Sequence, residues 1–165
     1  MAIKLIALDL DGTLLTSDKT VTTRTKDILA RAMSRGVTVT IATGRMLHSA
    51  LHFTRLIASD APVICCNGGY VGKAEEEPVF ACYFDPMLTR EFLTFAYTRN
   101  WYVNWYSGME IYAPEYREEY FTAYRTTARF IVNAVGNDYL GYTENVPQFV
   151  LRELDTGIGA YIRAV

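Results

Sequence analysis

Apolar residues in the first half of the chain alternate between short continuous runs and stripes at helical spacing. Residues 3–10 form a near-continuous apolar run, which predicts a strand covered on both faces. A helix is predicted from about residue 22 to 35, with Gly36 as its stop. Residues 37–42 and 62–66 predict two further strands, with a second helical stripe between them. This alternation predicts a βαβαβ unit with a parallel sheet, which binds ligands at the carboxyl ends of its strands.

The pattern changes after residue 68. Short strands at 70–72 and 79–83 predict a hairpin whose acidic tip is solvated. Asp85 and Pro86 then predict the start of a helix that runs to about residue 99. Both tryptophans and most of the tyrosines follow, and this shift in composition predicts a boundary near residue 84, with domains at 1–84 and 85–165. The second domain is predicted to hold strands at 102–106 and 109–113, a helix after Pro114, a loop over 133–147 and a strand at 148–154.

Composition and charge narrow the classes of function. Half of the 165 residues are hydrophobic, and 16 Lys and Arg stand against 18 Asp and Glu, so we expect a folded protein with no nucleic-acid or membrane partner. The chain starts without a leader-like or spanning segment, which predicts a cytoplasmic location. Cys65, Cys66 and Cys82 are expected to be reduced, buried thiols, because their number is odd and two of them are adjacent.

Two aspartates end the first predicted strand, in the segment DLDGTLL at residues 9–15. Side chains at i and i+2 of a strand share a face, so Asp9 and Asp11 should project together. Gly12 allows a tight turn and exposes backbone amides, so it is also predicted to bind phosphate. Such a pair suits phosphoryl transfer, with one carboxylate as nucleophile and the other as general acid and base. A Mg²⁺ ion, held by Asp9 and Asp11, would offset the crowded negative charge. The alternative is a polar turn with no chemistry.

Two further segments follow strand ends. Thr43, Gly44 and Arg45 supply a hydroxyl, an amide and a cation, which predicts a phosphate-binding site, although an ordinary helix cap is the alternative. Asn67 and Gly68 fit either a place beside that site or the turn into a hairpin. The histidine pair at 48 and 52 is interpreted as part of a solvated helix face, because no third metal ligand is evident.

The aromatic residues of the second domain are interpreted as core residues in preference to ligand contacts. Tyr116, Tyr120 and Tyr124 recur at helical spacing, and Trp101 and Trp105 lie in a strand-like stretch. Substrate selection is instead predicted for the turn at 107–110, because specificity is carried by loops.

The sequence resembles the haloacid dehalogenase-like phosphohydrolases, specifically the Cof-like sugar-phosphate phosphatases. The resemblance rests on DLDGTLL at 9–15, TIATGR at 40–45, ICCNGGY at 64–70 and the segment that follows. It implies an α/β fold: a partial Rossmann-like parallel core with an inserted α+β cap. It also implies hydrolysis of a small phosphorylated metabolite with Mg²⁺. The implied nucleophile is Asp9, the implied acid and base is Asp11, and the implied phosphate ligands are Thr43 and Gly44, with Asn67 and Gly68 beside the pocket.

The sequence departs from the family in its second half. The family's later lysine and GDxxND motif have no counterpart: Lys73 is the last lysine, and residues 135–138 match the motif in neither order nor spacing. The ending, from about residue 152, also fails to match, so we expect a truncated core. The first strand then becomes a sheet edge, which predicts association, and turnover should be severely reduced. Two hypotheses follow: an impaired phosphatase, or a catalytically inactive fragment that binds phosphate or associates into a homo-oligomer.

Overall fold

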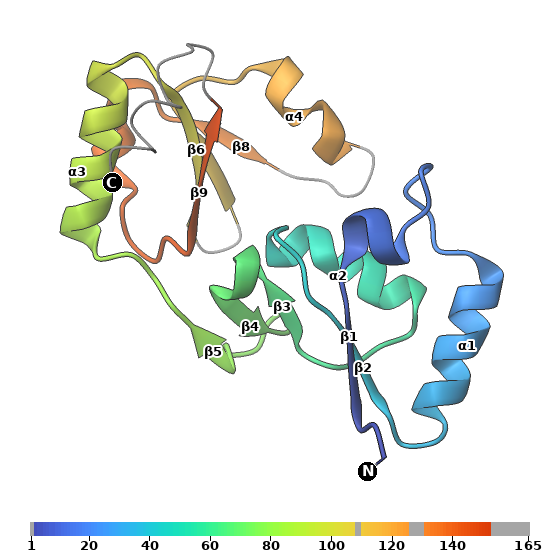
Figure 1. The fold of residues 1–165 in the computed structure, drawn as a ribbon. Helices are drawn as coiled ribbons and strands as arrows, with labels where there is room; N and C mark the ends of the chain where they lie inside the picture. The colour runs from blue at the N-terminus through green and yellow to red at the C-terminus, as the bar shows by residue number, and fades with distance from the viewer. Residues whose placement is uncertain (1, 108–109, 126–130, 153–165) are drawn as a thin grey trace, which may run out of the picture. The chain divides into compact units, whose positions relative to one another are not determined.

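The computed structural model describes residues 2–107, 110–125 and 131–152 (Figure 1). The chain divides into two compact units, Met1–Cys82 and Tyr83–Val165. The division falls two residues before the boundary that the composition predicts. None of the helices within the described ranges is long and apolar enough to cross a membrane.

Unit 1 begins with the predicted strand, helix and strand. Strand β1 (Leu5–Leu8) pairs in parallel with β2 (Thr38–Ile41), and helix α1 (Thr23–Met33) connects them. A wide turn, η1 (Leu10–Leu14), follows β1 directly. Helix α1 begins where the Thr22 hydroxyl accepts a hydrogen bond from the Thr25 amide at 3.1 Å. It ends before Gly36, whose φ of 80° suits the left-handed stop expected of glycine there.

The second helix and the third strand also form as predicted. Helix α2 spans Leu47–Leu56 and strand β3 spans Val63–Cys65. A single parallel bridge joins Ala42 to Ile64, so β3 continues the sheet beyond β2. The stripe that faces the interior is at most 3% exposed and consists of Met46, Ala50, Phe53 and Ile57. The carboxyl ends of β1, β2 and β3 therefore meet along one edge.

A hairpin completes unit 1. After a short turn, η2 (Cys66–Gly68), strand β4 (Tyr70–Gly72) runs antiparallel to β3. Strand β5 (Phe80–Ala81) pairs antiparallel with β4, which confirms the predicted hairpin.

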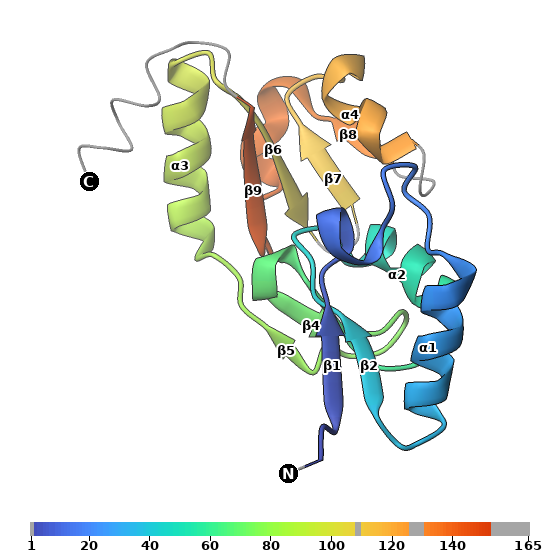
Figure 2. The ribbon, with the colours of Figure 1, turned by 45° about the vertical axis from the view of Figure 1, so that its right-hand side comes forward.

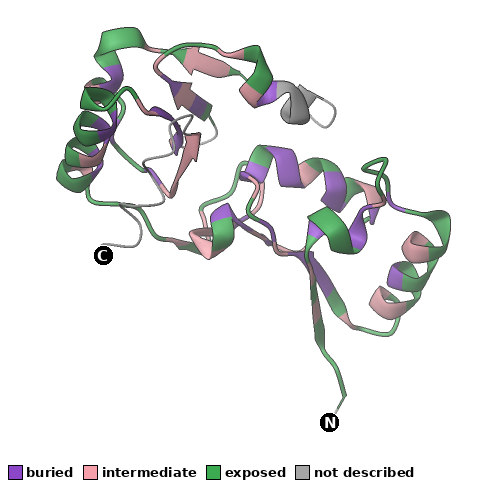
Figure 3. Cartoon of the chain, turned by 45° about the horizontal axis from the view of Figure 1, so that its top comes forward, coloured by how far each residue is buried: buried purple, intermediate pink, exposed green. Residues whose placement is uncertain are grey.

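The expectation that the first strand is covered on both faces is wrong. Leu5 is 56% exposed and Ile3 is 73% exposed, and the stretch that leads into β1 is coloured as exposed in Figure 3. Among the described residues, β1 has a single partner strand, β2. An apolar run is therefore no proof of burial, because coverage depends on segments elsewhere in the chain.

Unit 2 is a four-stranded sheet with helices packed on it (Figure 2). Helix α3 (Pro86–Thr98) starts as predicted at Asp85, whose carboxylate accepts hydrogen bonds from the amides of Met87 and Leu88. The other elements are β6 (Tyr102–Ser107), β7 (Glu110–Ala113), α4 (Glu118–Arg125), β8 (Val132–Ala134), η3 (Gly136–Gly141) and β9 (Gln148–Arg152). The strand order is β8-β7-β6-β9.

The loop predicted over 133–147 is wrong, because the segment holds the end of β8 and the whole of η3. Strand β8 has three residues and exists by pairing in parallel with β7, a tertiary contact with no periodic signature in so short a segment. The residues that mimic part of the GDxxND motif lie at the start of η3. Part of the turn at 107–110, predicted to select substrate, and the tail beyond 152 lie outside the described residues.

The prediction that the aromatic residues of unit 2 are core residues is confirmed for some of them and wrong for others. Trp105 is fully buried in the core between α3 and the sheet, and its indole N–H donates to the Tyr142 carbonyl at 2.7 Å. Tyr116, predicted as core, is 43% exposed. Tyr120 is partly buried, and the side chain of Tyr124 lies outside what is described. The helical spacing therefore identified the helix but not its buried face.

Leu10 anchors the turn that carries the two aspartates, and its side chain is fully buried. We expect Leu10→Ala to lower the free energy of unfolding by about 2–5 kcal/mol, because it leaves a cavity beneath the turn. Leu5→Ala is the matched control: the side chain is largely exposed, so the change should stay within about 0.5 kcal/mol. Urea denaturation of both variants measures this, and equal losses would contradict the anchoring role.

Candidate functional site

Turn η1 presents both aspartates at the end of β1. Its backbone closes through two wide hydrogen bonds, Leu14 N to Asp9 O at 3.1 Å and Leu15 N to Leu10 O at 2.9 Å. Gly12 has a φ of 82°, a conformation that favours glycine. Leu10 is buried whereas Asp9 and Asp11 are exposed, which is the alternation that the sequence predicts. Both carboxylates are thus accessible from solvent.

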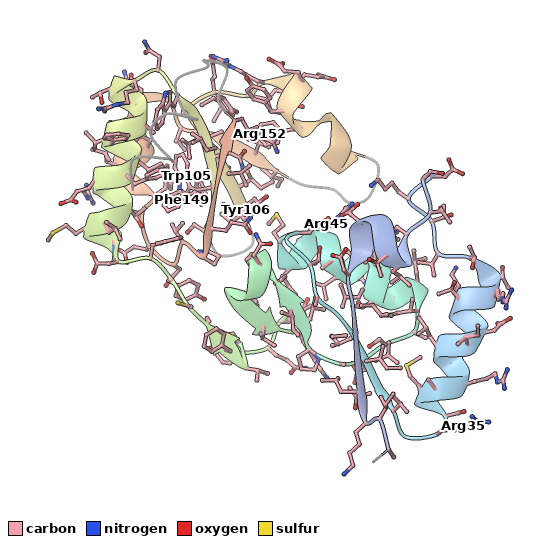
Figure 4. The ribbon with its side chains drawn as sticks, in the orientation of Figure 1. Arg35, Arg45, Trp105, Tyr106, Phe149 and Arg152 are labelled. Carbon is pink, nitrogen blue, oxygen red and sulfur yellow. The ribbon has the colours of Figure 1, made fainter. Side chains whose placement is uncertain are left out.

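Arg45 forms a bidentate ion pair with the carboxylate of Asp11. Its Nε lies 2.8 Å from Oδ2 and its Nη2 lies 2.9 Å from Oδ1. The arginine is itself held, because its guanidinium lies 5.1 Å from the centre of the buried Phe53 ring and its Nη1 donates to Ser49 Oγ at 3.4 Å. Its side chain is only 16% exposed, beside η1 (Figure 4). Such a bidentate pair fixes the orientation of the carboxylate and also stabilises its negative charge.

Lys19 supplies a second cation that sequence reasoning missed. Its Nζ lies 2.7 Å from Asp11 Oδ1, from a loop closed by hydrogen bonds between Thr16 and Thr20. Lys19 itself has a φ of 57°. A lysine eight residues after an aspartate has no periodic relation to it, so only the path of this loop reveals the contact. Its position after a polar Thr-Ser-Asp stretch was the one available signal of a turn.

These contacts hold Asp11 in its charged form. The hydrogen bond from Arg45, followed by that from Lys19, lowers the pKa of the Asp11 carboxyl to about 2, although partial burial opposes the shift. Asp11 is therefore a carboxylate at neutral pH. It cannot donate a proton while both cations remain on it.

Asp9 is differently placed. Its Oδ2 accepts a long hydrogen bond of 3.5 Å from the Thr13 hydroxyl. Within the described ranges, Asp9 makes no other side-chain hydrogen bond or ion pair. The exposed carboxylate consequently keeps lone pairs that could meet an electrophile or a cation.

Thr43 and Gly44 lie at the end of β2. Thr43 is buried, and its Oγ1 accepts a hydrogen bond from the Arg45 amide at 3.2 Å. The helix-cap alternative for Thr43 is wrong, because α2 begins at Leu47 and its N-cap position is Met46. Thr43 therefore orders the loop that carries Arg45 rather than the helix.

Asn67 and Gly68 form the turn between β3 and β4, and that turn also reaches the other two segments. Their φ angles are 53° and 91°, and the Asn67 amide donates to the Thr43 carbonyl at 3.2 Å. A methyl group at Gly44 would lie 2.8 Å from Asn67 Oδ1, so a larger residue there would require the Asn67 side chain to move. The structure thus brings Asn67 against the 43–45 segment. The two interpretations of Asn67 and Gly68, a turn into the hairpin and a place beside the predicted phosphate site, are therefore compatible.

The donor set fits part of a Mg²⁺ site. Mg²⁺ binds through one or two carboxylates together with waters and substrate phosphates. Asp9 offers a free carboxylate, whereas the side chain of Asp11 is occupied by Arg45 and Lys19. Over the described ranges there is no cluster of three or more His, Cys, Asp or Glu side chains able to hold a metal ion. The chain would therefore need ligands from water and phosphate.

Two smaller expectations concern possible metal or redox residues. His48 and His52 are both exposed on α2, which confirms the solvated face. Cys65 and Cys66 are free and buried as expected, but Cys82 is exposed, so the expectation of burial is wrong for it. Cys82 lies at the end of unit 1, outside the apolar run that buries the other two.

The comparisons with known proteins agree with this geometry. The family model of the haloacid dehalogenase-like hydrolases matches residues 6–158. The chain belongs to this family, in its Cof-like subfamily. The haloacid dehalogenase-like α/β fold is also confirmed by solved structures. A haloacid dehalogenase-like hydrolase from Bacteroides thetaiotaomicron matches with a TM-score of 0.82 at 22% identity, over 99% of this chain and 62% of that one.

Curated relatives match over shorter stretches. Pyridoxal phosphate phosphatase YbhA of Escherichia coli is 46% identical over 88 residues, which are 53% of this chain and 31% of that protein. Phosphatase YwpJ of Bacillus subtilis is 30% identical over 112 residues, which are 68% of this chain and 39% of that protein. The chain thus spans between about 30% and 40% of the length of these relatives.

Removing the arginine fork should release Asp11. We expect Arg45→Ala to raise the pKa of Asp11 from about 2 toward the ordinary value of about 3.9, because the largest cause of the shift is lost. The ¹³C chemical shift of the Asp11 carboxyl, followed by NMR against pH, measures this. Arg35→Ala is the control, because that arginine lies at the far end of α1 (Figure 4). An unchanged Asp11 pKa in Arg45→Ala would contradict the ion pair.

The same shift fixes the sign of its effect on stability. A lowered folded-state pKa stabilises the fold above the unfolded value of about 3.9, and this contribution is lost as the pH falls toward 2. The Asp11 side chain is 43% exposed, so solvent screening limits the contribution to about 1 kcal/mol or less.

Proposed function

We propose that this chain carries the nucleophile-bearing part of a Mg²⁺-dependent phosphomonoesterase that acts on a small phosphorylated metabolite. The observation that carries the proposal is the meeting of three strand ends, where Asp9, with a largely unoccupied carboxylate, lies two residues before an Asp11 that is held by two cations. Family membership supports the reaction type, and the name of one relative, pyridoxal phosphate phosphatase, supports a small phosphorylated substrate.

In the proposed reaction Asp9 attacks phosphorus and the bond from phosphorus to the ester oxygen breaks. Asp11 gives a proton to the leaving oxygen, and the phosphoryl group rests on Asp9. Asp11 then takes a proton from the water that attacks phosphorus, which releases phosphate and restores Asp9. A bound Mg²⁺ would offset the negative charge of Asp9 and the phosphate.

This reaction requires a rearrangement around Asp11. A carboxyl with a pKa of about 2 cannot serve as an acid near neutral pH, so Arg45 and Lys19 must leave it when substrate arrives. The negative charges of Asp9 and the phosphate must then raise the Asp11 pKa above its ordinary value, so that the carboxyl takes up a proton from water before it donates one. The oxygens of the incoming phosphate would accept hydrogen bonds from Arg45 and Lys19 in place of Asp11, since both side chains already lie at the site and bind oxyanions. Thr43 and the Gly44 amide would add hydrogen bonds to the same phosphate.

The test is hydrolysis of p-nitrophenyl phosphate and pyridoxal phosphate by the full 165-residue chain with and without Mg²⁺. We expect slow, Mg²⁺-dependent release of phosphate that falls to background in Asp9→Asn, because the nucleophile is lost. Asp27→Asn, at an exposed position of α1, should keep the wild-type rate. Equal rates for wild type and Asp9→Asn would remove the proposal. Slow turnover is expected because no GDxxND motif or later lysine is present in the sequence.

A second candidate function is association through the edge of unit 1. The observation that favours it is the exposure of Leu5 and Ile3 along β1, whose outer side pairs with no other described strand. Unpaired edges of this kind join other sheets readily. The cytoplasmic location expected from the sequence is compatible with either function.

Sedimentation velocity distinguishes the two candidates. If the edge drives association, the wild-type chain should form dimers or larger species in a concentration-dependent way, and Leu5→Lys should shift it toward monomer, because charged edge residues oppose pairing. Ile28→Lys, at an exposed apolar position of α1, is the matched control and should leave the distribution unchanged. A strictly monomeric wild-type chain would rule association out.

A further inference from the structure

A cavity of about 310 Å³ lies entirely within unit 2, between the end of α3, the start of β6, residues 114–117 and the start of η3. Figure 2 shows the end of α3 leading into β6 at this place. The volume falls within the range of small-molecule sites, about 300–1,000 Å³. Its lining contains no residue of the aspartate turn or of the 43–45 and 67–68 segments. The cavity is therefore independent of the proposed phosphatase function.

Three aromatic side chains line this cavity: Tyr97, Trp101 and Tyr102. The Tyr97 ring stacks on Tyr139, with centroids 4.8 Å apart and an interplanar angle of 21°. The Tyr102 hydroxyl donates to the Glu115 carbonyl at 2.6 Å. The Tyr97 ring is thus held in place before any ligand arrives, which lowers the entropy cost of binding. The Tyr102 ring is buried and packs on Tyr120, so it offers little surface to a ligand.

Two amide side chains complete the polar part of the lining. Asn137 Oδ1 accepts a hydrogen bond from the Tyr97 hydroxyl at 2.6 Å, so its NH₂ group remains as a donor. Asn100 also lines the cavity, and its side-chain amide makes no hydrogen bond to the described part of the chain. An asparagine amide offers a donor beside an acceptor, the arrangement that complements the edge of a nucleobase.

The charged groups at the cavity neutralise each other. Arg117 and Glu115 both line it and form an ion pair, and the Arg117 guanidinium lies 5.1 Å from the centre of the Tyr102 ring. A phosphate or carboxylate would have to compete with Glu115 for this cation. The lining consequently favours an uncharged ligand.

We infer that this cavity binds a neutral, flat nitrogen heterocycle, such as a free nucleobase or the base of a nucleoside. Aromatic rings contact the faces of such a ligand, and the Asn100 and Asn137 amides pair with its edge.

The indole N–H signals of the two tryptophans test this site by NMR on the full chain. Trp101 lines the cavity and Trp105 is buried in the core, and Trp101→Phe assigns the two signals. We expect adenine and adenosine to shift the Trp101 signal in a saturable way. D-glucose and inorganic phosphate should leave it in place. Absence of any shift with adenine and adenosine would overturn the inference, as would an equal shift with glucose or phosphate.

Two variants remove the amides with little risk to the fold. Asn100 has a φ of 54°, which glycine adopts easily, so Asn100→Gly deletes the side chain without strain. Asn137 is exposed, so Asn137→Ala is also tolerable. Each should weaken adenosine binding about five- to tenfold, the usual effect of one lost hydrogen bond. Asn133→Ala, in β8 and outside the cavity lining, is the matched control. Unchanged affinity in both cavity variants would overturn the assignment.

Discussion

The ion pair between Arg45 and Asp11 is the contact that determines how the charged groups of the candidate site are arranged. It joins the turn after β1 to the loop after β2, segments 34 residues apart, through two hydrogen bonds of 2.8 and 2.9 Å. Without a cation at this place, two neighbouring carboxylates would repel each other and any anion nearby. Because Phe53 and Ser49 hold the guanidinium, the helix α2 that carries them also determines the position of the acid.

Much of this arrangement could be predicted from the sequence because it rests on local rules. A DxDGT segment needs only strand alternation and a left-handed glycine to place both acids outward, and the burial of Leu10 between them shows that alternation. The stripe from Met46 to Ile57 has helical spacing over three turns, so its burial could be predicted from the spacing alone. The capped start of α3 at Asp85 is likewise encoded by two adjacent residues.

What could not be predicted depends on partners distant in the chain. The exposure of β1 follows from how many strands lie beside it, and no property of residues 3–10 encodes that number. The expectation that β1 is a sheet edge came instead from the mismatch between the second half of the sequence and the family. Lys19 reaches Asp11 through the path of a loop, and β8 exists through its pairing with β7. Among the candidate site residues, Thr43 does not cap α2, because its hydroxyl accepts a hydrogen bond from the amide of Arg45 and the helix begins later. In each case a tertiary contact decides the outcome, and single-sequence periodicity does not report it.

The distribution of charge explains how two neighbouring acids stay together at this turn. Asp9 and Asp11 contribute two negative charges, and Arg45 and Lys19 lie at the same turn with two positive charges. The balance is complete before substrate binds, so a phosphate would arrive at a site with no net positive charge to attract it. In the proposed phosphatase function, binding would therefore proceed by exchange, in which phosphate oxygens replace the Asp11 carboxylate as partners of the two cations. Such an exchange would remove the main cause of the lowered Asp11 pKa, so phosphate binding and the proton affinity of this acid would be coupled by the same two side chains.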